Sequence, residues 1–471
     1  MTVTTESPLV VFDRLTRTDR PVHTPVLFDT ACVLGGSVAG LLAARVLADH
    51  SRRVLIIERD VTDTEGQGRT GVPQDRQGHV LLPGGRAQIE RWFPGFTGTT
   101  QDCGGVLVRP DQQAVYLDGR QQMPNRETAI LAGTRPFLES RIRAHVLDLP
   151  NVSTISAQVT GLAFRDDAVH SVRYTVGRDE RTVNADFVVD AMGRSSKLSD
   201  WVERAGFQRP PLQRLRTDIN YATALFDRPR DPDELPLSCA LARFDGSPDG
   251  LALGGVVAVE AGQWLVMLMS YEPNRPPSSI DAFRATCAKL PPIYRHAVSG
   301  TVTREIETYR QADSRRRDFS GLTHFPARVV SVGDAVASFN PIHGQGMSSA
   351  SLHASCLSEY LTSAPQLSRP ARGFFDLQAV VTDAAWMMSA GEDAARLDAI
   401  AGVDAPEYIA RQRRNLEQVL RATLVDQSIT DAFNNVSFML AHPSTLTDED
   451  LVERAIAVNQ IHTTGRQMGI G

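Results

Sequence analysis

Residues 30–40 read TACVLGGSVAG, a short apolar run that leads directly into glycines. From there to Leu47, apolar residues would occupy nearly every face of a helix. Residues 53–58, RVLIIE, form a second apolar run. These runs predict a buried strand, a glycine turn, a buried helix and a second buried strand of the kind found in parallel sheets. Residues 30–58 therefore predict one βαβ unit.

The turn of this unit carries the pattern of a dinucleotide-binding site. It fits G-x-G-x-x-G with serine at the second glycine, and glycines let the backbone approach a pyrophosphate at the N-terminus of the next helix. Glu58 follows about 20 residues later, where a carboxylate accepts hydrogen bonds from a ribose. A plain strand-to-helix turn would explain the glycines alone, but not Glu58 at that distance. The predicted site comprises Gly35, Gly36, Ser37, Val38, Ala39, Gly40, Glu58 and Arg59.

A second motif further along the chain favours FAD as the dinucleotide. The apolar run 329–332 ends in Gly333 and Asp334, and a later loop opens a helix at Gly346 and Met347. Asp334 would hold the hydroxyls of the ribityl chain, and the N–H groups of Gly346 and Met347 would stabilise negative charge at the flavin C2 carbonyl. The alternative is a helix cap with Asp334 as a turn former, which does not account for both halves together.

Composition excludes several other classes of protein. The 471 residues carry a net charge of −6 and are 42% hydrophobic, a globular balance that disfavours nucleic-acid binding. The five cysteines are scattered and form no disulfide framework or metal-ligand pattern. No apolar run reaches the roughly 18 residues of a membrane span. We expect a cytoplasmic protein without a metal, nucleic-acid or membrane partner.

Together the motifs resemble the FAD-dependent monooxygenases related to the aromatic hydroxylases, over about residues 30–400. More narrowly, the segments 69–74, 137–141, 190–194 and 339–347, with His79, resemble the bacterial branch that includes epoxidases of polyether pathways such as those for lasalocid and monensin. The resemblance implies that Arg69 and Arg141 contact the phosphates and adenosine part of FAD and that Val159 touches the adenine. It also assigns to the cofactor site Gly71, Val72, Asp190, Gly193, Gly333, Asp334, Pro341, Gly344, Gly346 and Met347.

The predicted fold class is α/β. A Rossmann-like FAD-binding domain of the glutathione-reductase type would carry an inserted antiparallel sheet, with expected strands near 220–226, 251–260 and 264–271, and helices after about residue 375. The predicted ranges are 1–28 for an N-terminal extension, 29–211 with 311–375 for the FAD-binding domain, 212–310 for the substrate-binding sheet and 376–471 for the C-terminal helices.

Two departures from the family pattern affect the electron donor and one loop. Two residues separate Asp190 from Gly193, whereas aromatic hydroxylases place this aspartate and glycine side by side. The spaced form is closer to flavin-dependent prenyl reductases and halogenases, so the donor is NADPH or NADH, used directly or through a partner flavin reductase. Gln77 and Gly78 stand where the branch has histidine and alanine.

The resemblance implies oxygen insertion from O2 through a flavin C4a-hydroperoxide, which requires no protein nucleophile, so no catalytic residue is assigned. The lone histidines His79 and His343 are more often structural, and the sequence contains no evident relay to ionise a phenol. With an apolar sheet face at Leu265, Met267 and Met269, this favours epoxidation or hydroxylation of a hydrophobic natural product. The alternatives are a prenyl-chain reductase, an aromatic hydroxylase, a halogenase and a flavoprotein without turnover. The halogenase is disfavoured because the sequence contains no W-x-W-x-I-P segment.

Overall fold

The computed structural model describes residues 6–60, 77–229, 235–243 and 250–467. Its central layer is a five-stranded parallel sheet in the order β18-β12-β1-β2-β8. The predicted βαβ unit is confirmed, and the later apolar run 329–332 supplies another strand of the same sheet. The unit consists of β1 (Phe28–Leu34), α2 (Val38–His50) and β2 (Ser51–Glu58). The other strands of the sheet are β8 (Val152–Ser156), β12 (Phe187–Asp190) and β18 (Val329–Ser331).

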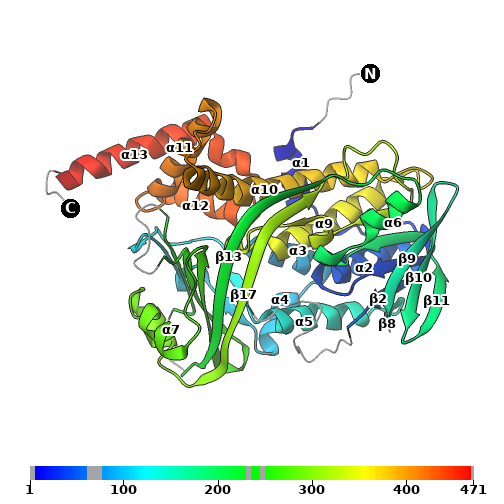
Figure 1. The fold of residues 1–471 in the computed structure, drawn as a ribbon, viewed down its shortest axis with the longest axis horizontal. Coiled ribbons are helices and arrows are strands. Elements are labelled where there is room, and N and C mark those ends of the chain that lie inside the picture. The colour runs from blue at the N-terminus through cyan, green and yellow to red at the C-terminus, as the bar shows by residue number, and fades with distance from the viewer. Residues whose placement is uncertain (1–5, 61–76, 230–234, 244–249, 468–471) are drawn as a thin grey trace.

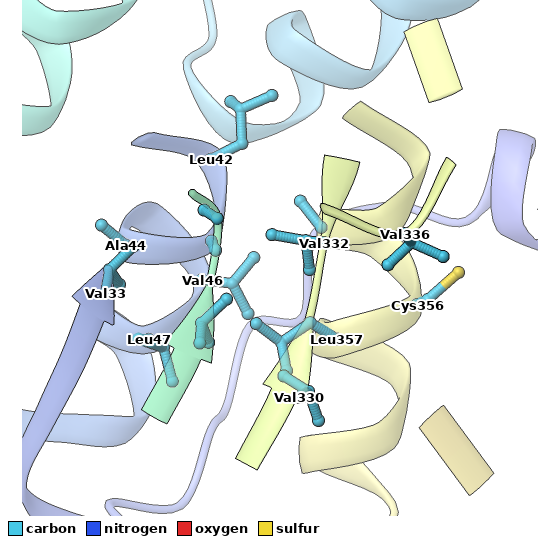
Figure 2. Packing of buried hydrophobic residues seen from close by; sticks show 14 of the residues in the cluster. Val33, Leu42, Ala44, Val46, Leu47, Val330, Val332, Val336, Cys356 and Leu357 are labelled. Carbon is cyan, nitrogen blue, oxygen red and sulfur yellow. The ribbon is translucent and has the colours of Figure 1, made fainter. Parts of the chain in front are cut away.

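The core forms between this sheet and the two helices α2 and α9 (Gly346–Thr362). Figure 2 shows Val33 of β1, Leu47 of α2, Val330 of β18 and Leu357 of α9 gathered in one cluster. All four side chains are fully buried, because strands covered on both faces carry apolar residues continuously. The carboxyl ends of β1, β12 and β18 therefore sit at one fixed edge.

A second, eight-stranded sheet follows the order β19-β17-β13-β16-β15-β14-β5-β6. Figure 1 shows its long strands β13 and β17 side by side between the parallel sheet and the C-terminal helices. The three predicted strands are confirmed as β13, β15 and β16. The bounds are β13 (Leu212–Asp227), β14 (Leu237–Leu241), β15 (Leu253–Val259), β16 (Gln263–Tyr271), β17 (Val302–Arg317), β19 (Ala337–Ser338), β5 (Gln113–Leu117) and β6 (Arg120–Gln121).

This sheet does not follow the predicted ranges closely. Strand β17 runs through residue 310, and β5 and β6 come from the segment assigned to the FAD-binding part. The domain ranges themselves stay a prediction.

The smaller elements cover the edges of the two main sheets. Two three-stranded antiparallel sheets have the orders β11-β10-β9 and β3-β7-β4. Their strands are β9 (Gln158–Arg165), β10 (Ala168–Val176), β11 (Asp179–Asn184), β3 (Val80–Leu81), β4 (Val106–Val108) and β7 (Ile130–Ala132). The shorter helices are α3 (Pro83–Trp92), α4 (Phe96–Asp102), α5 (Arg135–Leu147), α6 (Leu198–Arg204), α7 (Ile280–Cys287) and α8 (Pro292–Ala297).

The N-terminal extension contains a helix that belongs to the main core. Helix α1 (Pro8–Arg17) begins after Ser7, whose hydroxyl accepts a hydrogen bond from the Val10 N–H at 3.4 Å. Phe12 and Leu15 are fully buried in the core cluster of the parallel sheet. Arg14 forms an ion pair of 2.8 Å with Glu359 of α9. The segment before β1 is thus an integral part of the fold.

The predicted helices after residue 375 are confirmed. They are α10 (Arg372–Ala401), α11 (Glu407–Ala422), α12 (Gln427–Ser437) and α13 (Glu449–Gln467). Helix α10 packs on α9 and on β13, so it joins the parallel sheet to the large sheet. Among the described residues, no helix combines the length and apolar character needed to cross a membrane.

Candidate FAD site

The glycine turn between β1 and α2 permits no side chain at two of its positions. Gly35 has a φ of +106°, and a Cβ there would lie 2.4 Å from the Ala191 carbonyl oxygen. A Cβ at Gly40 would lie 1.9 Å from the Gly35 carbonyl oxygen. These approaches seat the start of α2 against the ends of β1 and β12, and the short Val38 and Ala39 lie in the first turn of that helix. The turn thus brings the N-terminus of α2 to this edge of the sheet, where a phosphate could bind.

Glu58 lies at the end of β2 beside this turn, as predicted. Its Oε2 accepts a hydrogen bond of 2.7 Å from the Gly36 N–H, and a Cβ at Gly36 would come within 3.4 Å of that oxygen. The Glu58 carbonyl accepts from the Ala157 N–H at 2.8 Å, and Val159 follows two residues later in β9; its contact with the adenine stays a prediction. Arg59 follows at the exposed end of the strand. The adenosine half of a dinucleotide fits this corner.

Ser37, the departure from the glycine pattern, has a structural role that the sequence did not predict. Its hydroxyl donates to Glu139 Oε2 at 2.6 Å and accepts from Arg135 at 3.2 Å. Arg143 donates to the other Glu139 oxygen at 2.6 Å, and Glu139 and Arg143 are both buried. This network fixes α5 against the glycine turn.

Asp190, at the end of β12, is fully satisfied within the protein. It accepts hydrogen bonds from the Met192 N–H at 3.1 Å, the Ser196 hydroxyl at 2.6 Å and the Ser331 hydroxyl at 2.9 Å. Burial raises its pKa, and these hydrogen bonds oppose that shift. Asp190 therefore connects β12 to β18. Gly193, which has a φ of +63°, lies close to Asp334.

Asp334 differs from Asp190 in having no partner of its own. Among the described residues, none forms a hydrogen bond or ion pair with its carboxylate, although protein surrounds it and burial raises its pKa. Arg135, Arg194 and Arg315 attract it electrostatically from a distance and oppose that rise. The side chain is only half-buried, so its carboxylate oxygens are open to a ligand with hydroxyl donors.

The turn that carries Asp334 is fixed to α2 and α9. Gly333 has a φ of +61°, and a Cβ there would lie 2.5 Å from the Ala39 Cβ. The Gly333 N–H donates to Nδ1 of the buried His353 on α9 at 2.9 Å, which requires an unprotonated Nδ1. The spacing of Gly333 and Ala39 brings the two halves of the predicted site into contact.

The loop before α9 ends in an open helix N-terminus. The 3-10 turn η5 (Pro341–His343) is followed by Gly344, which has a φ of +66°, and α9 begins at Gly346. A Cβ at Gly346 would have no atom within 4 Å, while Met347 is buried. The first N–H groups of a helix have no partner within it. They could therefore bind a carbonyl oxygen of the flavin, and this contact stays a prediction.

Lowering the pH is expected to destabilise this turn through His353. Burial lowers its pKa to about 3, whereas the unfolded chain has a value of about 6.5. Between these values the unfolded state alone binds the proton, so the free energy of unfolding falls as the pH falls, by up to about 1.4 kcal/mol per pH unit. In His353→Asn, whose amide oxygen retains an acceptor near Nδ1, denaturant unfolding at pH 7, 6 and 5 should show a shallower fall than in the wild type. Equal slopes would contradict this role.

A buried polar cluster that the sequence did not predict supports η5. Asn340 Nδ2 donates to the Tyr271 hydroxyl at 2.8 Å and to Asp393 Oδ1 at 3.0 Å. Asp393 on α10 is 0% exposed and also accepts from the Thr217 hydroxyl at 3.3 Å and from Arg396 at 3.4 Å. Asn340 accepts from the Ile342 N–H at 3.2 Å and caps the turn. These residues come from β13, β16, η5 and α10, so no sequence spacing indicates them.

The sequence shows no evident relay to ionise a phenol, but the structure places one of the two flavin-loop histidines beside a carboxylate. His343 Nε2 lies 3.3 Å from Glu392 Oε2, and Glu392 also pairs with Arg243. Burial and the nearby Arg243 lower the pKa of His343 to about 3, so this imidazole is neutral at physiological pH. The other predicted flavin-loop histidine, His79, has a pKa lowered to about 4 by burial and by Arg135.

The inner face of the large sheet is apolar where it meets η5. Ile342 packs in one cluster with Tyr221, Leu253, Met267 and Met269. Leu265 continues this face in the adjoining cluster, so the predicted apolar sheet face is confirmed at all three positions. A Cβ at Gly78 would lie 3.0 Å from Leu265 and Met267, which explains why this position, alanine in the related branch, carries the smallest residue here.

The other predicted residues are placed less firmly. Arg141 lies on α5 two residues beyond Glu139, and its guanidinium is 3.3 Å from Cys103 Sγ. Its contact with FAD stays a prediction. Arg69, Gly71 and Val72 lie outside the described residues. Within the described part of the chain, no three His, Cys, Asp or Glu side chains gather as metal ligands.

The donor set fits FAD. The glycine turn and Glu58 would hold the pyrophosphate and adenosine ribose, Asp334 the ribityl hydroxyls, and the start of α9 the pyrimidine carbonyl of the flavin. A nicotinamide dinucleotide has no ribityl chain, so it does not explain the carboxylate of Asp334, which has no partner among the described residues.

Comparison with known sequences supports this reading. A family model described as FAD binding domain matches residues 29–366. Protein Rv3254 of Mycobacterium tuberculosis is 33% identical over 342 residues, which cover 69% of this chain and 71% of that protein. Squalene monooxygenase SE2 of Panax ginseng is 31% identical over 156 residues, which cover only 31% of this chain and 26% of that protein.

Solved structures share the fold at low sequence identity. The flavin-dependent brominase Bmp2 has a TM-score of 0.63 at 13% identity and covers 93% of this chain and 100% of its own. PqsL, a probable FAD-dependent monooxygenase from Pseudomonas aeruginosa, has a TM-score of 0.60 at 15% identity and covers 78% of this chain and 96% of its own. The chain therefore belongs to the FAD binding domain family, and its fold is that of the flavin-dependent monooxygenases.

Proposed function

We propose that the protein is an FAD-dependent monooxygenase that inserts one oxygen atom from O2 into a hydrophobic natural product, by epoxidation of an alkene. The observation that carries this proposal is the apolar sheet face opposite η5, where Ile342 packs with Tyr221, Leu253 and Met269. Bound FAD, once reduced, would supply the oxygen-activating chemistry, and the protein would orient the substrate and exclude water.

The geometry favours an apolar substrate that lies against this face of the sheet near η5. Epoxidation delivers oxygen to a π bond without removing a proton from the substrate, so an apolar lining meets its requirements. The similarity of 156 residues to a protein named squalene monooxygenase supports an alkene, because squalene is an apolar polyene. Membership of the polyether-type branch, a role in antibiotic biosynthesis and a cytoplasmic location belong to the same proposal.

The reductant is part of the proposal as well. We infer that NADPH or NADH reduces the flavin, directly or through a partner flavin reductase. The spacing between Asp190 and Gly193 motivates both routes, because it resembles the form found in flavin-dependent prenyl reductases and halogenases.

Aromatic hydroxylation is the second candidate, and the His343–Glu392 pair favours it. A neutral histidine beside a carboxylate can accept the proton of a phenol, which promotes oxygen transfer to the ring. The distance of 3.3 Å between Nε2 and Oε2 permits such a pair at the end of η5. Substitution His343→Gln should then abolish turnover of phenols but leave turnover of alkenes.

Oxygen labelling tests the proposal. Holoenzyme supplied with NADPH and a flavin reductase would be offered squalene and other polyenes, and a set of phenols, under oxygen-18 gas, with the products analysed by mass spectrometry. We expect an alkene product that carries one labelled oxygen atom, and none under argon. A product that forms under argon and gains two hydrogens would instead establish the prenyl-chain reductase.

A further inference from the structure

A pocket of about 500 Å³ opens on the far side of the polar cluster that supports η5. Its lining comes from β13, β17, the segment after β16 and helix α10. Figure 1 shows β13 and β17 side by side, and β13 packs against α10. Four arginines line the pocket, namely Arg216, Arg275, Arg310 and Arg396.

A bulge in β13 creates this arrangement. Two residues of β13, Thr217 and Asp218, stand opposite a single residue of β17, and Asp218 has a φ of +48°. A bulge changes the direction of the side chains around it. Thr217 consequently points inward to Asp393, while Arg216 and Asp218 line the pocket.

The pocket carries an excess of positive charge. Its lining contains two carboxylates, and each is shared between arginines. Asp218 pairs with Arg216 and, at 2.7 Å, with Arg310, and Glu272 pairs with Arg275 at 3.2 Å. The buried Asp393 lies behind Arg396 and adds a third carboxylate. Four guanidinium groups therefore face three carboxylates.

The guanidinium groups retain donors for a ligand. The side chains of Arg275 and Arg310 are 70% and 52% exposed, whereas that of Asp218 is 7% exposed and lies beneath them. Each guanidinium has five N–H donors in a planar fork that matches carboxylate and phosphate oxygens. Asp218 and Glu272 occupy only part of the fork of Arg310.

The rest of the lining suits an apolar or aromatic moiety next to the anion. Leu397 and Ile400 of α10 border the pocket, and Ile400 is 69% exposed. Arg396 lies over the Tyr271 ring at 4.0 Å, and the Tyr271 hydroxyl receives the Asn340 hydrogen bond that supports η5. The pocket is therefore linked to the flavin loop through one layer of side chains.

We propose that this pocket binds the oxyanion of a reaction partner, either a phosphate of the nicotinamide donor or a carboxylate of the apolar substrate. The two candidate ligands rest on the proposed function. The existence of an anion-binding site rests on the arginines and on the apolar residues that border them.

Calorimetric titration of the oxidised holoenzyme tests this site without turnover. NADPH, NADH and dodecanoate serve as probes, with the variants Arg310→Gln and Arg275→Gln. Arg275 is mostly exposed, so Arg275→Gln should fold normally and keeps the test valid if Arg310→Gln misfolds. Arg295→Gln, on the exposed surface of α8, is the matched control.

Loss of one charge-assisted contact should weaken binding about tenfold or more in both pocket variants and leave the control unchanged. Weaker binding of the dinucleotides identifies the phosphate source, and weaker binding of dodecanoate identifies the carboxylate source. If no probe binds, or if every probe binds the pocket variants and the control equally, the site is refuted. Because these readings require no product, they stay independent of the oxygen-labelling result.

Discussion

Replacing Gly40 by alanine is expected to unseat the cofactor turn and to yield protein with little FAD. The new methyl group would meet the Gly35 carbonyl oxygen at 1.9 Å and the Ala191 Cβ at 3.2 Å, and neither of these atoms belongs to a flexible side chain. Overpacking of this kind costs about 3 kcal/mol or more. Thermal unfolding should therefore begin at a clearly lower temperature, and the FAD-to-protein absorbance ratio should fall.

A glycine elsewhere in the fold provides the matched control. Gly391 lies inside α10, where an added methyl group would have no atom within 4 Å. Alanine favours a helix by up to about 1 kcal/mol over glycine, so Gly391→Ala should be neutral or stabilising. If Gly40→Ala retained FAD and stability as well as Gly391→Ala does, the close approach at the turn would be wrong.

The second large effect concerns Asp334→Ala, which should weaken FAD binding by about 10- to 100-fold. The carboxylate has no partner among the described residues, so its removal deprives the ligand of a charged acceptor worth about 1.5 to 3 kcal/mol. Folding should survive, because no described side chain depends on it. Reconstitution of the apoprotein with FAD, followed by fluorescence quenching, measures the dissociation constant.

Two further variants separate charge from position. Asp334→Asn keeps one acceptor oxygen and should lose less affinity than the alanine variant. Asp376→Ala removes an exposed carboxylate of α10 and should leave FAD binding unchanged. A dissociation constant that is unaltered in Asp334→Ala would show that this aspartate only shapes the turn.

The parts of the fold that follow from local patterns could be predicted from the sequence. The buried strands around Gly35 and the two acidic strand ends were identified because continuous apolar runs differ sharply from their surroundings. Strand β17 was missed because residues 302–317 are rich in charged residues, many of them at least partly exposed. Helix α1 was overlooked although Ser7, Pro8 and the apolar Phe12 and Leu15 form a readable helix start.

The candidate site was predictable only where one motif contains its parts. Gly36 and Glu58 are joined by a short βαβ unit, so their proximity follows from the topology. Asn340 and Asp393 are 53 residues apart and meet through the packing of α10, which no spacing rule describes. The Ser37–Glu139 bond is likewise a tertiary contact, formed across 102 residues. Sequence reasoning therefore located the cofactor but not the polar groups that hold its loop.

The identity of the bound cofactor tests the central claim most directly. The protein should purify yellow, and heat or acid denaturation should release the flavin into solution, where chromatography and mass spectrometry identify it. The account predicts non-covalent FAD at close to one molecule per chain. Release of NAD, of another nucleotide or of no flavin, with no FAD bound on reconstitution, would contradict the assignment of Asp334 and the glycine turn to one FAD site.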